Sequence, residues 1–203
     1  MAHAAMHEDV MLPPQQRAAG AGVYNEKLGM WVFLGSEVMF FTALIGTYVI
    51  LRFAHPEAWK PPGQVLAIPV TAVNTFLLIC SSVTMVKAFA AAQDGLQRQL
   101  RLWLLATVII GATFVGIQVY EYRHLIEKGF IPSEGLYGST FYTMTGFHGF
   151  HVTMGVICMI YVTLKAFQGK YTATDHRGVE VIGLYWHFVD LVWIILFTIV
   201  YLI

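Results

Sequence analysis

Five ionisable side chains lie inside stretches of the sequence that are otherwise apolar: Glu37, His148, His151, His187 and Asp190. A charged group in the hydrocarbon of a membrane costs at least a few kcal/mol, so such a residue must be neutral, paired or turned toward other protein. Glu37 lies near the middle of an apolar run of about 24 residues. We expect it to face the interior of a helix bundle and to meet a partner there. The alternative is a neutral acid with a purely structural hydrogen bond.

The histidines and Asp190 are compatible with two kinds of chemistry. Two imidazoles on one helix and one on another could ligate haem or a metal, since neutral imidazole is a common ligand. However, His148 lies near the centre of its apolar stretch and His187 only about six residues into the next, whereas a haem between two helices needs histidines at matching depth. A relay of protons through carboxylates and imidazoles is the second possibility. His187 and Asp190 are three residues apart, so on a helix they can contact each other or share a partner.

Further polar residues follow the apolar stretches at helical spacing. One polar stripe, suited to hydrogen bonds between helices, consists of Thr71, Asn74, Ser81 and Ser82. Gln118 and Glu121, three residues apart, share a face near the outer end of their stretch. Glycine-rich phosphate loops, HExxH and the nucleophile elbow are absent from the sequence. We therefore expect no catalytic residue of the soluble-enzyme type.

The elements that must hold these residues are long and apolar. Hydrophobic residues make up 57% of the 203 residues and charged residues only 12%, unlike a soluble domain. Five segments lack Lys and Arg and are long enough to cross about 30 Å of hydrocarbon, namely 28–51, 65–86, 102–120, 136–164 and 181–203. We predict an all-α membrane protein: an N-terminal tail at 1–27, then at 28–203 one bundle of five transmembrane helices in which consecutive spans are antiparallel neighbours.

The basic residues predict the orientation of this bundle. One side would carry eight of them, Arg17, Lys27, Lys87, Arg98, Arg101, Lys165, Lys170 and Arg177, and the other side four, Arg52, Lys60, Arg123 and Lys128. The positive-inside rule then places the N-terminus in the cytoplasm and the C-terminus on the outer, periplasmic side. The net charge of zero and the lack of any basic run argue against a nucleic-acid partner.

Small residues predict where helices approach closely. Ala112 and Gly116, four residues apart, form a close-approach pair in the third span. In the fourth span, small residues share a narrow arc roughly opposite His148 and His151, and they are Ser139, Thr143, Gly146, Gly149 and Thr153. A helix specialised on two faces should have neighbours on both, so we expect the fourth span to be internal rather than exposed to lipid.

Four blocks of sequence stand out together: SEVMFF at 36–41, QVYEY at 118–122, YGSTFYTMTGFHGFHVTMG at 137–155 and YWHFVDLVWIILFTIVYL at 185–202. They strongly resemble subunit III of cytochrome c oxidase. The resemblance covers essentially everything from Leu28 onward, and the paired GFHGxHV and YWHFVDxVW blocks in this order are highly specific. Larger members of the family have seven spans, and this chain resembles the five-span bacterial form without the first two.

The resemblance implies an accessory, non-catalytic subunit of a proton-pumping haem-copper terminal oxidase, which reduces oxygen to water in aerobic respiration. Haem and copper would belong to partner subunits, so no cofactor or metal would be bound by this chain. The implied partners are the catalytic subunit I, subunit II, structural phospholipids, and further subunits or a respiratory supercomplex. The implied location is the cytoplasmic (inner) membrane of a bacterium, which the chain crosses several times.

The resemblance also assigns roles to single residues. Glu37 takes the place of the family's intramembrane, carbodiimide-reactive glutamate, close to bound lipids and to a proton-uptake path. His148, His187 and Asp190 match the family's blocks and there form polar pairs within the bundle rather than metal ligands. Two basic residues beyond the fourth span, Lys165 and Lys170, are candidate contacts for lipid headgroups, with solvated loop charges as the alternative.

Three other assignments remain open. The first is subunit III of a quinol oxidase, although quinol-oxidising relatives often read Ser-Asp in the first block and Thr-His-Gly in the fourth, so Ser36-Glu37 and Gly146-Phe147-His148-Gly149 favour the cytochrome c branch. The second is a related subunit attached to a nitric oxide reductase. The third, of a different class, is a self-contained redox protein in which His148 or His151 and His187 bind haem.

Overall fold

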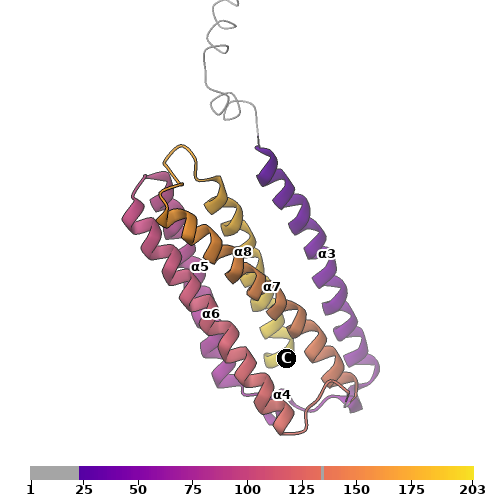
Figure 1. The fold of residues 1–203 in the computed structure, drawn as a ribbon. Coiled ribbons are helices and arrows are strands. Elements are labelled where there is room, and N and C mark those ends of the chain that lie inside the picture. The colour runs from indigo at the N-terminus through magenta and orange to yellow at the C-terminus, as the bar shows by residue number, and fades with distance from the viewer. Residues whose placement is uncertain (1–22, 134) are drawn as a thin grey trace, which may run out of the picture.

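The protein is a bundle of long helices (Figure 1). The structure, a computed structural model, describes residues 23–133 and 135–203, and no strand occurs among them. The helices long and apolar enough to cross a membrane are α3 (Asn25–Ala54), α5 (Ile68–Gln93), α6 (Gln97–Glu127), α7 (Leu136–Phe167) and α8 (Arg177–Phe197), the last continued by a π-helical segment, η2 (Thr198–Leu202). The short η1 (Pro56–Ala58) and α4 (Pro62–Val65) connect α3 to α5. The predicted all-α class is confirmed, and most of the predicted tail at 1–27 lies outside the described residues.

The helices extend beyond most of the predicted spans because capping, rather than hydropathy, determines where they end. α5 and α6 end just before Gly95 and Gly129, whose φ angles of 71° and 83° favour glycine. The amide of Leu96 then donates to the carbonyl of Ala91 at 2.9 Å, which is the Schellman arrangement of a helix C-terminus. α5 and α6 are consequently joined by only a tight turn.

α8 is the most enclosed of the long helices, and glycine allows its neighbours to approach it. A Cβ atom on Gly111 of α6 would lie 2.6 Å from the ring of Trp186 on α8, whereas one on Gly116 would meet nothing within 4 Å. Ala112 is exposed. The prediction of a close approach at Ala112 and Gly116 is therefore wrong within the described part of the chain. The true contact residue, Gly111, is turned about 100° away from Ala112 around the helix.

α7 has several neighbours, which leave one of its faces uncovered. It packs against α6, α8 and α3, and a Cβ on Gly149 would press against Gln118 of α6 at 3.0 Å. On another face, Phe150 and Ile157 are 60% and 53% exposed. The predicted neighbours on two faces are confirmed, but no described residue packs on a third face of α7, so this chain alone does not enclose the fourth span.

α3 lies at one side of the bundle (Figure 1). It packs against α7 and α8 but at most slightly against α5, the next long helix in the chain. The prediction that consecutive spans are neighbours therefore holds for α5 with α6, α6 with α7 and α7 with α8, and is wrong for α3 with α5. The connection that contains η1 and α4 carries the chain from α3 to α5.

The polar stripe of α5 binds other helices along its whole length. Ser81 accepts a hydrogen bond from Nε1 of Trp186 at 2.9 Å, and Asn74 donates to the carbonyl of Phe114 on α6 at 3.3 Å. The two remaining stripe residues bond acidic side chains of α6 and α8. The predicted role of the stripe in joining helices is confirmed.

The glycine contact gives a first testable prediction. Gly111→Ala should lower the free energy of unfolding by about 1–3 kcal/mol, because the new methyl group overlaps the Trp186 ring in a packed interface. Gly116→Ala, on the same helix with open space around it, should be neutral or slightly stabilising. Thermal unfolding in detergent, followed by circular dichroism, measures both. Equal effects of the two substitutions would contradict the packing of α6 on α8.

Candidate functional site

Glu37 meets a histidine of another helix inside the membrane. Its Oε2 lies 3.1 Å from Nε2 of His151 on α7, and the two side chains are only 16% and 12% exposed. Nδ1 of His151 lies 2.7 Å from the carbonyl of Phe147. A carbonyl only accepts, so Nδ1 carries a hydrogen, and the 3.1 Å contact is attractive only with a proton between Oε2 and Nε2. The pair therefore shares one proton and is neutral as a whole, which lowers the cost of holding both groups in hydrocarbon.

Aromatic rings surround this pair. The ring of Phe41 lies edge-on to His151 at 5.1 Å between centroids, and Phe40 and Phe147 meet at 5.1 Å close by. The hydroxyl of Tyr185 donates to the backbone carbonyl of His151 at 2.9 Å. The predicted intramembrane partner of Glu37 is thus present, in an apolar setting that strengthens its hydrogen bond.

His187 and Asp190 share a partner on α5, as their spacing predicts. The hydroxyl of Ser82 donates to Oδ2 of Asp190 at 2.7 Å and lies 3.1 Å from Nδ1 of His187. Because a hydroxyl has a single hydrogen, Nδ1 must donate to Ser82. Asp190 is buried, and its second oxygen, Oδ1, has no partner within the described residues.

His148 is a packing residue of the core. It is completely buried, its Nε2 lies 3.2 Å from the carbonyl of Val189, and its ring stacks on Trp193 with centroids 4.7 Å apart. Since the carbonyl can only accept, Nε2 donates, and Nδ1 is left without a partner among the described residues. The structure does not bring His148 together with Glu37 or with His187.

Gln118 and Glu121 point to different neighbours although both lie on α6. Gln118 donates to the carbonyl of Thr145 on α7 at 3.1 Å. Glu121 accepts hydrogen bonds from Thr71 of α5 at 2.8 Å and from Tyr201 of η2 at 3.3 Å. Both are buried, so they join helices rather than form a common surface.

The contacts of the intramembrane histidines lead to different helices. His151 uses its nitrogens on α3 and on its own helix, His148 uses one on α8, and His187 uses one on α5. Among the described residues, no three His, Cys, Asp or Glu side chains are grouped so that they could hold one metal ion. Nδ1 of His148 and Nε2 of His187 have no partner among the described residues, but no contact there brings these two rings together.

A pocket of about 450 Å³ lies where α3 begins, between α3, α7 and α8. Its charged lining residues are Glu26, Lys165, Asp175 and Arg177, and its apolar ones include Met30, Val162, Val181 and Ile182. Nζ of Lys165 lies 4.4 Å from the ring centroid of Tyr161, another lining residue. Lys170 is exposed and does not line the pocket. Of the two basic residues predicted to contact lipid, Lys165 lines this pocket and Lys170 does not.

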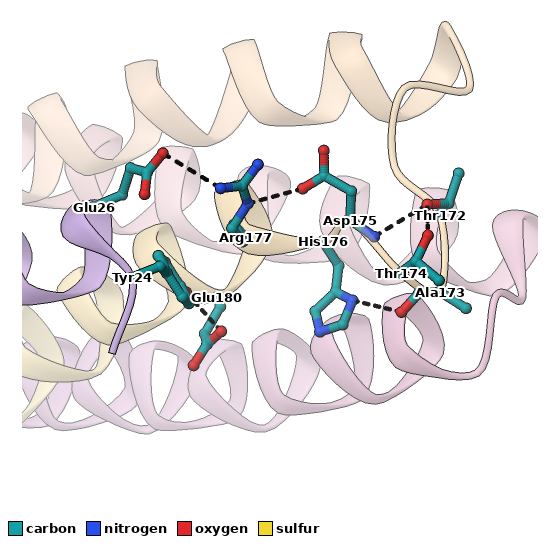
Figure 2. Close-up of polar contacts among 9 residues, drawn as sticks. All are labelled: Tyr24, Glu26, Thr172, Ala173, Thr174, Asp175, His176, Arg177 and Glu180. Carbon is teal, nitrogen blue, oxygen red and sulfur yellow. Dashed lines mark hydrogen bonds and ion pairs between the residues drawn. The ribbon is translucent and has the colours of Figure 1, made fainter. Parts of the chain in front are cut away.

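Charged and polar side chains tie the start of α3 to the start of α8 (Figure 2). Tyr24 donates to Glu180 at 2.6 Å, Lys27 pairs with the other oxygen of Glu180 at 2.5 Å, and Arg177 points toward Glu26 at 3.7 Å. Burial and the neighbouring Glu180 raise the pKa of Tyr24, so its hydroxyl keeps the proton that it donates. Sequence reasoning missed this cluster, although an acid in the first turn of α8 is a usual signal of a helix start.

Comparison with known proteins assigns the chain to a family. Residues 15–203 match the family described as Cytochrome c oxidase subunit III. Similar proteins include cytochrome c oxidase subunit 3 of Thermostichus vulcanus, 40% identical over 176 residues that cover 86% of each chain, and the probable cytochrome c oxidase subunit 3 of Mycobacterium tuberculosis, 42% identical over 176 residues, or 87% of each chain. The cytochrome bo(3) ubiquinol oxidase subunit 3 of Pseudomonas aeruginosa is 35% identical over 179 residues, 88% of this chain and 85% of the relative. The resemblance found in the sequence is confirmed, and the chain belongs to the cytochrome c oxidase subunit III family of multi-pass membrane proteins.

Proposed function

We propose that this chain is the accessory subunit III of a proton-pumping haem-copper oxidase that takes its electrons from cytochrome c. It stabilises the catalytic subunit I, holds phospholipids and supports proton uptake over many turnovers, while haem and copper reside in partner subunits. The observation that carries this proposal is the Glu37–His151 pair, which joins α3 to α7 inside the membrane. Family membership supplies the complex in which the pair acts.

The pair matters because α3 has few fully buried side chains, although partly buried ones such as Leu34, Leu44 and Val49 also pack on the core. Phe41 and Tyr48 are its only buried residues. Lipid tails are as apolar as side chains, so association of membrane helices depends on packing and polar contacts rather than on a hydrophobic driving force. Glu37 supplies such a contact at the middle of α3, and Lys27 supplies one near its start. Arg52 supplies one near its end, through the carbonyls of Ile199 in η2 and of Ile203 just after it.

Spaces beside α3 are suited to lipid. Besides the pocket at Lys165, a pocket of about 190 Å³ lies between α3 and α7, lined by Leu44, Thr47, Ser139, Thr140, Thr143 and Met144. A phospholipid whose headgroup lies at Lys165 would have acyl chains along the apolar lining of the larger pocket. An ammonium group attracts an anionic headgroup, and apolar side chains accommodate the tails.

The orientation follows from the distribution of basic residues. We place the N-terminus and the Lys165 pocket at the cytoplasmic side of a bacterial inner membrane and the C-terminus at the periplasmic side. In this arrangement the phospholipid at Lys165 belongs to the cytoplasmic leaflet, where a path for proton uptake also opens. The same orientation puts Arg52 at the opposite end of α3.

The first prediction from the proposed function concerns the Glu37–His151 pair. Glu37→Ala and His151→Ala should each weaken the attachment of α3 by about 1 kcal/mol. Each should also reduce the number of turnovers that the whole oxidase completes before it loses activity. The double variant should be little worse than either single one, because both remove the same contact. Glu37→Gln should stay closer to the native lifetime, since its amide can donate to Nε2 of His151.

The control for this prediction is Glu57→Ala, because Glu57 lies in the exposed connection after α3. The oxidase with Glu57→Ala should complete as many turnovers before it loses activity as the unchanged oxidase. Additive effects of the Glu37 and His151 substitutions, or native lifetimes for both, would mean that the pair does not hold α3 in place during turnover.

The second prediction concerns bound lipid. Lys165→Ala should reduce the phospholipid that remains with the purified oxidase, measured by mass spectrometry after extraction, because the headgroup loses its cation. Lys170→Ala is the matched control: it removes the same charge outside the pocket and should leave the lipid content unchanged. Equal loss with both variants would point to a diffuse charge effect and not to a lipid bound in this pocket.

The third prediction concerns the electron donor. A relative at 35% identity is named a ubiquinol oxidase subunit, so a quinol oxidase is the second candidate. The purified complex should oxidise reduced cytochrome c rapidly and a quinol slowly or not at all, measured as oxygen consumption with each donor. The reverse preference would keep the chain in the family and move it to the quinol branch.

A further inference from the structure

The polar group formed by Ser82, His187 and Asp190 lies within the apolar lengths of α5 and α8 and reaches the outer surface of the bundle. His187 is the tenth residue after Arg177 in the 26-residue segment Arg177–Leu202, about 15 Å along a helix that rises about 1.5 Å per residue. The side chains of His187 and Ser82 are both partly exposed. A polar group at this depth is costly if it faces lipid alone.

Nε2 of His187 is a hydrogen-bond acceptor at this surface without a donor among the described residues. Nδ1 donates to Ser82, because the single hydrogen of Ser82 goes to Asp190. No hydrogen bond within the described residues uses Nε2, and this atom is not among the buried atoms left without a partner, so it reaches the surface. A neutral imidazole with its hydrogen on Nδ1 presents Nε2 as an acceptor. Lipid tails offer no hydrogen-bond donor to it.

Three exposed hydroxyls elsewhere on the long helices form hydrogen bonds within their own helices. The hydroxyls of Ser36 and Thr47 on α3 donate to carbonyls three and four residues earlier, and Thr113 on α6 does the same. Their faces therefore tolerate lipid. The surface at His187 differs because its acceptor is directed outward.

Apolar side chains frame His187 on both helices. Leu191, one turn further along α8, is 57% exposed, and Val86, one turn beyond Ser82 on α5, is 54% exposed. Ile79 and Ile194 continue this surface and are also exposed. Since Ser82 bonds His187 and the two helices run antiparallel, Leu191 lies level with Ile79, and Val86 lies on the other side of His187 along the same face. The surface made of Ile79, Ser82, Val86, His187, Leu191 and Ile194 is called the α5/α8 face below.

We propose that the α5/α8 face is the docking surface for a transmembrane helix of the catalytic subunit, and that this helix donates a hydrogen bond to Nε2 of His187 from a hydroxyl, indole or amide side chain. Polar contacts across apolar helix faces are a usual means of joining membrane helices. The inference rests on the proposed function, which supplies the partner complex. A second copy of this chain and lipid alone are the competing occupants.

The test places a photoreactive benzoylphenylalanine at position 191 or at position 109 of the chain in the assembled oxidase. Leu191 and Ile109 are matched, since both are 57% exposed and both lie in the membrane, but Ile109 is on α6. After irradiation, mass spectrometry identifies what is attached. The probe at 191 should label a helix of the catalytic subunit, and the probe at 109 should not.

Three results would overturn the inference: attachment of only lipid at 191, attachment of a second copy of this chain at 191, or equal labelling of the catalytic subunit from 109. Co-purification separates failure of this inference from failure of the proposed function. A chain that co-purifies with no oxidase contradicts both the proposed function and the docking surface. An intact complex whose catalytic subunit is not labelled contradicts only the docking surface.

His187→Leu supplies an independent measurement. Loss of one hydrogen bond between membrane helices should weaken retention of the chain by about threefold to tenfold, measured as the fraction left on the oxidase after detergent washing. The isolated variant must keep its helical circular dichroism and its unfolding temperature, so that weaker retention reports docking. Native retention by a folded His187→Leu variant would contradict the hydrogen bond.

Discussion

The arrangement of this protein depends on one property of the membrane: hydrocarbon gives apolar helices no reason to leave lipid for each other. Close packing and polar contacts must therefore hold the bundle. α8 shows both. Trp186 packs over Gly111 and donates to Ser81 on α5, and Trp193 donates to Thr75, also on α5. Each indole fills space between helices and satisfies its own N–H, which would be costly if left buried without a partner.

The same constraint divides the bundle into two parts with different attachment. α5, α6, α7 and α8 are joined through glycine contacts and buried hydrogen bonds. α3 has fewer buried side chains, and polar contacts at its start, middle and end add to the packing of its partly buried apolar side chains. The gaps that remain beside α3 are lined by apolar and small side chains and, where α3 begins, also by the charged Glu26, Lys165, Asp175 and Arg177. A helix with few buried side chains leaves room for lipid beside it. The proposed lipid-holding role of the chain thus follows from how α3 is attached, and the same attachment gives Glu37 its importance.

Much of this arrangement could be predicted from the sequence, because hydropathy identifies spans and spacing identifies shared faces. Thr71, Asn74, Ser81 and Ser82 were recognisable as a stripe, and the common partner of His187 and Asp190 followed from their separation. The identity of partners did not follow, because a helical wheel gives a direction around one helix and not the helix that lies there. Glu37 could not be paired with His151 without knowing that α3 packs on α7. The Ala112 and Gly116 spacing matched a close approach, but the choice between that face and Gly111 depended on Trp186 from a distant segment. The helix ends at Gly95 and Gly129 were readable and were missed, since spans were bounded by charge alone.

The geometry of the Glu37–His151 pair limits how it can support proton uptake. One proton shared between Oε2 and Nε2 can change sides over 3.1 Å without any net charge appearing in the hydrocarbon. A relay needs a third group to pass that proton onward. Nδ1 of His151 is engaged by the carbonyl of Phe147, and the hydroxyl of Tyr185 bonds the backbone of His151 rather than its ring. Within the described residues, then, no further side chain accepts the proton of the pair. The carbonyl of Phe147 accepts a hydrogen bond from His151 but does not take up its proton. In the function proposed above, the pair therefore supports proton uptake mechanically, by holding α3 and the lipid proposed beside it.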